Sequence, residues 1–329
     1  MPIPILVAAG IAAVGGLGVA GTLAAKDTMD EAKALGERGE RLIAAAKERA
    51  AAAQSATQGK VEALGNTKIR ILSHNMNTFL RLFRTMKDVK FNDSVGMDEL
   101  RDFTPQSSQV RMLTNASVTA ADLTRGYGGG IASGGVVALG AYGAVGMLGT
   151  ASTGTAIGTL SGAAATNATL AWLGGGSLAA GGLGVAGGAA VLGGIVAAPA
   201  LLAGAFYLNC KADEAMSKAK TFYAQAETYQ AQCNYSCKLL SAISERAGQI
   251  TYVLNRMDER FGQGVRHMHG IIARSGTDWN ALTRAQQEHV AAVAMMAKTM
   301  KVIMDTPLCR EDGSLNPESA RVLQRLGTG

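Results

Sequence analysis

Apolar side chains in the charged parts of the chain recur every three or four residues, which is the spacing of one face of an α-helix. The clearest stripe lies in KIRILSHNMNTFLRLFRTMKDVKF, which begins at Lys68. Its apolar members are Ile69, Leu72, Met76, Phe79, Leu80, Phe83 and Met86. With the alanine-rich, charged segment before it, the stripe predicts one very long helix from about residue 27 to residue 90, with Gly59 and Gly65 as candidate bends.

The polar side of the same stripe is basic. Its basic members are Arg70, Arg81, Arg84, Lys87 and Lys90. A basic amphipathic helix can lie on an anionic membrane surface. A helix that turns its apolar side to a protein core and its basic side to water has the same pattern. We favour the core-facing helix and keep the membrane surface as the alternative.

Three further helices follow from the same spacing and from signals at helix ends. We expect them over about residues 106–125, 212–261 and 283–305. Thr283 followed by Gln286 fits a capping box, in which the side chain of each residue bonds the backbone N–H of the other.

The C-terminal tail predicts a turn and a short helix. Asp312 and Gly313 form the turn signal, Asn316 is placed to cap a helix that begins with Pro317, and Gly327 is its stop. No segment alternates apolar and polar residues between hairpin turns. The sequence therefore predicts an all-α fold: a long antiparallel helical bundle or coiled coil that flanks a Gly/Ala-rich hydrophobic helical hairpin.

The hairpin is expected in a block without charge. Residues 126–210 contain no Asp, Glu, Lys, Arg or His, and they hold 24 of the 42 glycines. Composition then divides the chain into an apolar Gly-rich N-terminal helix (1–25), charged and amphipathic long helices (26–125), the uncharged glycine-zipper hairpin block (126–210), long C-terminal helices (211–305), and a C-terminal turn and short helix (306–329).

Small residues in the block form stripes that would let helices approach closely. Pro199 would kink the last helix of the block, and Trp172 ends the middle one. The stripe glycines are Gly154, Gly158, Gly162, Gly184 and Gly188. Two interpretations compete: a membrane-spanning hairpin, and the buried centre of a soluble helical bundle.

The composition of the block lies between these two interpretations. Leu, Ile, Val and Phe each favour insertion by about 0.3–0.6 kcal/mol at the centre of a membrane helix, whereas Gly and Ala supply little. A glycine also costs about 1 kcal/mol relative to alanine inside a helix. We therefore expect a segment that is sheltered in one state and inserted in a bilayer in another, with the long charged helices covering it in solution.

The N-terminal apolar segment, residues 1–25, is long enough to cross a bilayer. It is rich in glycine and alanine, so it is either a membrane anchor or a helix that packs against the block. No Lys or Arg precedes its apolar run, so we do not expect a cleaved signal peptide.

Two resemblances bear on this arrangement. The long helices around an uncharged hairpin resemble the architecture of α-helical pore-forming toxins. The run GTASTGTAIGTLSGAAATNATLAWLGGG, with KADEAMSKAK after the block and GTDWNALTRAQQEHVAAVAMMAKTMKVIMDTPLCREDG near the end, resembles a family of uncharacterised bacterial glycine-zipper helical proteins. Members often carry the label "chemotaxis protein" by automatic transfer. The resemblance implies a bacterial or phage source and a membrane- or defence-related context.

The net charge of +6 is spread over both flanks. Residues 26–125 carry 16 basic and 13 acidic side chains, and residues 211–329 carry 15 and 12, so each flank has a net charge of +3. A mild, even excess of this kind suits an anionic membrane surface. Nucleic acid binding would need a clustered basic face with stacking aromatics, and aromatic residues are only 5% of the chain.

The usual signatures of catalysis and of metal or cofactor binding are missing. The chain has no GxxxxGK[ST], HExxH or GxSxG motif. His267 and His269 diverge on a helix, and Asp258 is expected on a helix surface without a partner. Trp172 and Trp279 are either interfacial anchors or core residues. We predict no catalytic, cofactor or metal site, and the protein is not expected to be an enzyme.

The function expected from these features is membrane activity. The hairpin would insert into an anionic lipid bilayer, and the protein would act as a pore-forming or membrane-disrupting effector, toxin-like or in phage defence. The alternative is a non-enzymatic soluble or peripheral scaffold in which the block is a permanently buried core. We expect a homo-oligomer or a partner helical protein, no small-molecule substrate, and a bacterial cytoplasmic location from which the protein associates with or enters a membrane.

Overall fold

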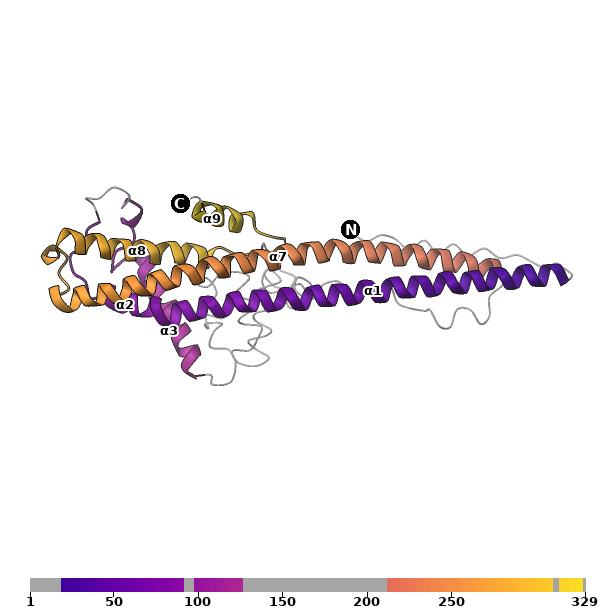
Figure 1. Ribbon diagram of the computed structural model, residues 1–329, viewed down its shortest axis with the longest axis horizontal. Coiled ribbons are helices and arrows are strands. Elements are labelled where there is room, and N and C mark those ends of the chain that lie inside the picture. Colours follow the sequence, from indigo (N-terminus) through magenta and orange to yellow (C-terminus); the bar gives the residue numbers. More distant parts are fainter. Residues whose placement is uncertain (1–18, 92–97, 127–211, 310–313, 328–329) are drawn as a thin grey trace, which may run out of the picture. The chain divides into compact units, whose positions relative to one another are not determined.

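The computed structural model describes residues 19–91, 98–126, 212–309 and 314–327 (Figure 1). Within these ranges every extended element is a helix, and no strand is present, so the predicted all-α fold is confirmed. The elements are α1 (Val19–Ile71), the π-helix η1 (Leu72–Met76), α2 (Asn77–Phe83), the 3-10 turn η2 (Asp98–Leu100), α3 (Ser108–Gly126), α7 (Ala212–Ser275), the 3-10 turn η5 (Trp279–Ala281), α8 (Arg284–Asp305) and α9 (Pro317–Gly327).

The first long helix starts before the predicted residue 27 and ends at Phe83, short of the predicted residue 90, whereas α7 runs beyond its predicted end. α1, η1 and α2 follow one another without a break, and α1 continues through Gly59 and Gly65. α7 passes the expected end at residue 261 and stops at Ser275. Gly276 follows with φ +80°, and its N–H donates to the carbonyl of Ile272 at 2.9 Å, which is the αL ending of a helix.

The predicted helix caps are present. The Thr283 side chain accepts from the Gln286 N–H, and the Gln286 side chain accepts from the Thr283 N–H, so the capping box is confirmed. At the start of α9, Asn316 Oδ1 accepts from the Glu318 N–H at 3.1 Å, and Pro317 is the first helical residue. Side chains that satisfy the first N–H groups of a helix stabilise its start.

The chain divides into two compact units. The first takes Met1–Glu48 and Ala197–Asn234, and the second takes Arg49–Val196 and Tyr235–Gly329. α1 and α7 each contribute to both units. We describe each unit by itself.

In the first unit, α1 and α7 meet through small side chains. Ala32 packs with Ala215 and Ala219, and all three are at most 2% exposed. A Cβ added at Gly39 would lie 2.7 Å from Cε1 of Phe222, so this glycine leaves the room that the phenylalanine ring occupies. Both contacts advance in the same direction along the two helices, which are therefore parallel here.

In the second unit, α1 and α7 are again parallel, and α8 runs the other way. Thr57 bonds the carbonyl of Leu240, and Arg70 further along α1 bonds Asp258 further along α7. Gly264 of α7, by contrast, lies against Val293 in the middle of α8. The predicted bundle is present, but its antiparallel pair is α7 and α8. The eight residues between these two helices force them to reverse, whereas the long intervening chain leaves the direction of α1 and α7 open.

The core of the second unit is aromatic at its centre. The rings of Phe79 and Phe83 stack at 5.0 Å between centroids, Phe261 of α7 meets Phe79 at 5.5 Å, and Trp279 meets Phe91 at 5.4 Å. The whole apolar stripe that begins at Ile69 is buried, with no member more than 4% exposed. This helix therefore faces a protein core, as we favoured, and Trp279 is a core residue.

The expectations for the uncharged block lie outside the described residues, apart from its first residue, Gly126. This holds for the stripe glycines, for Trp172 and for Pro199, and also for the N-terminal residues 1–18. No helix in the described ranges combines the length and the apolar character needed to cross a membrane.

Candidate functional site

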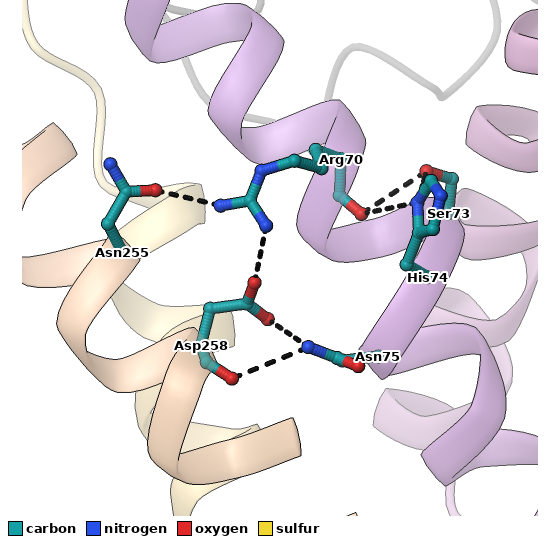
Figure 2. Close-up of polar contacts among 6 residues, drawn as sticks. All are labelled: Arg70, Ser73, His74, Asn75, Asn255 and Asp258. Carbon is teal, nitrogen blue, oxygen red and sulfur yellow. Dashed lines mark hydrogen bonds and ion pairs between the residues drawn. The ribbon is translucent and has the colours of Figure 1, made fainter. Parts of the chain in front are cut away.

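A buried carboxylate joins α1, η1 and α7 (Figure 2). The side chain of Asp258 is 5% exposed. Its Oδ2 accepts from Nη1 of Arg70 at 2.6 Å, and its Oδ1 accepts from Nδ2 of Asn75 at 2.9 Å. The second nitrogen of the Arg70 fork donates to Oδ1 of Asn255 at 2.7 Å. Both oxygens of Asp258 are thus engaged, one of them in a charge-assisted bond.

The π-helix η1 supplies one of these contacts. A π turn widens the helix locally and alters which face the next side chains occupy, and such turns often occur at functional positions. Asn75 lies within η1 and points at Asp258 (Figure 2). The turn is held from the other side by Ser117 of α3, whose hydroxyl donates to the carbonyl of Leu72.

This cluster corrects one expectation. Asp258 was expected on a helix surface without a partner, and that expectation is wrong: the residue is 4% exposed and has two side-chain partners. Arg70 is 188 positions away in the sequence, so no local spacing could indicate the pair. A fully engaged carboxylate of this kind ties α1, η1 and α7 together.

The predicted basic face does not stay together. Arg70 is used in the ion pair with Asp258. Lys87 is exposed, and its backbone pairs with the connection between α7 and α8, where its N–H donates to the carbonyl of Thr277 at 2.9 Å. Lys90 is exposed. Arg81 and Arg84 line a groove.

The groove lies between α2, α3 and the end of α7 and has a volume of about 930 Å³. α2 and the two residues after it supply both arginines, α3 supplies Thr114 and Val118, and α7 supplies His269. No acidic side chain is present among its described lining residues. The sequence indicated the arginine pair, but it gave no signal that Thr114 and His269 would lie beside it, because only the fold brings these helices together.

The hydroxyl groups of the groove already donate to backbone carbonyls. Thr78 donates to His74 at 3.1 Å, and Thr114 donates to Val110 at 2.7 Å. Thr85 donates to Leu82 at 2.7 Å. These hydroxyls can accept from a ligand, but their hydrogens are used. Hydrogen-bond donors for a ligand must therefore come from other lining residues.

A buried lysine lies elsewhere in the core of the second unit. Lys68 is 1% exposed, and burial lowers its pKa from 10.5 to about 7. The negative charge of Asp305 at the end of α8 opposes part of that effect. Asp305 also accepts from Nζ of Lys301 at 2.7 Å. Removing an ammonium from water disfavours its charged form, which is the cause of the lowered pKa.

The histidines and cysteines do not form a metal site within the described residues. The His267 ring lies against the His289 ring, tilted by 49° with 4.2 Å between centroids, while His269 lines the groove. Nε2 of His289 is 3.0 Å from the carbonyl of Gly264. No group of three or more His, Cys, Asp or Glu side chains is placed to hold a metal ion in the described part of the chain.

The protein is thus an all-α helical protein with a basic groove, and its sequence contains an uncharged glycine-rich block. Comparison with the families of known proteins, with curated proteins and with solved structures found no match to this chain. The groove and the uncharged block are therefore interpreted from their own chemistry.

Proposed function

We propose that the protein is a non-enzymatic, membrane-active helical protein whose uncharged block, residues 126–210, enters a lipid bilayer and permeabilises it. The observation that carries the proposal is the absence of any charged side chain over 85 consecutive residues in a chain that is 17% charged. Burying even one charge in a bilayer costs several kcal/mol, at least about 2.5 at the centre of a helix, and this block has none to bury.

The described helices support this assignment by the way they use their own apolar faces. The stripe of α1, η1 and α2 is buried against α7 and α8, and α3 covers part of it. These helices therefore have little apolar surface left for a bilayer. The block is the segment that a membrane would receive, and the described helices are the body that carries it.

The test is release of a dye from anionic liposomes by the full chain and by a variant with Gly154, Gly158 and Gly162 changed to Leu. Leucine is more apolar than glycine and by itself favours insertion. It also fills the stripe through which helices would pack closely. We expect the wild type to release dye, and the variant to float with liposomes yet lose most of the release.

A control variant carries the same kind of change at open helical positions. Gly59 and Gly248 have no atom within 4 Å of an added Cβ, so both positions have room for the start of a larger side chain. This variant is expected to release dye as the wild type does. Equal dye release from the stripe variant and the wild type, or no release from either, would contradict the proposal that the block forms a pore.

The second candidate is a soluble or peripheral scaffold in which the block is a permanent core. Fractionation distinguishes it from the proposal. A soluble scaffold stays in the supernatant without detergent and a peripheral one is released from membranes by carbonate washing, whereas an inserted protein stays in the membrane pellet after that washing. We propose that either function operates in a bacterial cell, with toxin-like or antiviral action as the biological role.

A further inference from the structure

The groove between α2, α3 and α7 combines a cationic rim with an apolar floor. Arg81, Arg84 and His269 are exposed at the rim. Leu80 and Ala121 are 1% and 4% exposed and form part of the floor, and Val118 adds an apolar side chain that is 48% exposed. A large apolar side chain that stays half in water inside a groove offers contact area to an amphiphilic ligand.

The two arginines are available to a ligand. No ion pair joins Arg81 or Arg84 to any residue whose side chain the structure describes, whereas Arg70 on the same helical segment is held by Asp258. The threonine hydrogens are committed to backbone carbonyls. The donors that remain are the two guanidinium forks, the side-chain amide of Asn77 and the His269 ring.

This donor set selects the ligand by charge and by shape. A guanidinium presents N–H donors in a planar fork that matches the oxygens of a phosphate. No carboxylate lines the described part of the groove to repel an anion. An apolar floor next to the donors suits a phosphate that is joined to a hydrocarbon part.

We propose that this groove binds a phosphate group, and that the phosphate belongs to the headgroup of an anionic phospholipid. The lipid source rests on the proposed membrane function, while the phosphate chemistry does not. The groove would hold the second unit against the membrane surface through Arg81 and Arg84, with the first carbons of the lipid over Val118.

The experiment measures binding of the full chain to vesicles of phosphatidylcholine alone and of phosphatidylcholine with phosphatidylglycerol. The test variant is Arg81→Gln with Arg84→Gln. Its control is Arg256→Gln with Arg260→Gln, which removes the same charge from exposed arginines of α7 that do not line the groove. All four side chains are exposed, so each protein should fold, and circular dichroism checks that it does.

We expect the wild type to prefer the anionic vesicles and the groove variant to bind them about 25-fold more weakly, since each basic side chain near an anionic surface contributes roughly a factor of five. The control should lose no more than about threefold, because its arginines act only through screened, longer-range attraction. An equal loss of vesicle binding in both variants would show a general effect of charge and would contradict a binding site in the groove.

Equilibrium dialysis with inorganic phosphate, at constant ionic strength, separates the two sources. A second variant, Val118→Trp, fills the groove without changing charge, and it should lose phosphate binding together with the arginine variant. Phosphate binding that both variants abolish, in a protein that ignores vesicles, would support the phosphate site and overturn the lipid source and the membrane function. Vesicle binding that neither groove variant weakens would overturn this inference and leave the membrane function standing.

Discussion

Lys68 shows how one residue can make the stability of the second unit depend on pH. Its pKa is lowered from 10.5 to about 7 by burial, against the opposing charge of Asp305. Between these two values the unfolded chain binds a proton at this position and the folded chain does not. Stability therefore rises as the pH increases through this window.

We expect Lys68→Met to remove this dependence. Methionine has a similar length and needs no water around a charge, so the variant should be more stable than the wild type near pH 7, and the difference should shrink toward pH 10. The free energy of unfolding of the wild type should rise by at most about 1.4 kcal/mol per pH unit because of Lys68. Urea unfolding of both proteins at several pH values measures it.

Lys60→Met is the control, because Lys60 lies exposed on the same helix. Its stability difference from the wild type should stay constant over the same range of pH. A constant difference for Lys68→Met as well would contradict the account of the buried ammonium.

The residue scale is also where the sequence was least informative. The burial of the apolar stripe followed from its spacing, since Phe79, Leu80 and Phe83 recur at helical intervals. The partners of charged residues could not be inferred from spacing, because Asp258 and Arg70 meet only when two helices that are distant in the sequence pack together. Local sequence cannot encode a contact whose other half lies 188 positions away.

At the scale of elements, glycines set how closely α7 approaches its neighbours. A Cβ added at Gly262 would lie 2.8 Å from Nδ2 of Asn75, the nitrogen that donates to Asp258. A Cβ at Gly248, about four turns away on α7, would meet nothing within 4 Å. The first glycine is required by the contact between α7 and η1, and the second is not.

The two alanine substitutions should therefore change the stability of the protein in opposite directions. Gly248→Ala is expected to stabilise the protein by up to about 1 kcal/mol, because alanine is the better helix former. Gly262→Ala gains the same helix term but pushes Asn75 away from a buried carboxylate, and a lost hydrogen bond of this kind costs about 1–3 kcal/mol. Thermal and urea unfolding of the full chain compare them, and equal effects from both would contradict the role given to η1.

The capped starts of α8 and α9 were the features best predicted from sequence, and helix continuity was predicted less well. The caps at Thr283 and Asn316 are determined by side chains within three residues, so their signals are local. The π turn at η1 and the extension of α7 to Ser275 depend on tertiary contacts, such as the bond from Ser117 to Leu72. Patterns of propensity carry no information about such contacts.

At the scale of the whole molecule, the chain consists of charged helical flanks and an uncharged block between them. The bundle was predictable because amphipathic spacing is strong in both flanks. The parallel arrangement of α1 and α7 could not be predicted, since a long connection permits either relative orientation. The remaining question is whether residues 126–210 enter a bilayer while the flanking helices stay in water.

The most direct measurement uses an environment-sensitive fluorophore at a single cysteine, placed by Ser161→Cys in the block or by Tyr235→Cys in the second unit, where Tyr235 is 73% exposed. The four native cysteines are replaced by alanine. On adding anionic vesicles, we predict that the probe at position 161 shifts to shorter wavelength and is quenched by groups attached to the lipid chains, while the probe at position 235 stays in water. A protein that binds the vesicles with both probes still in water would contradict membrane insertion of the block.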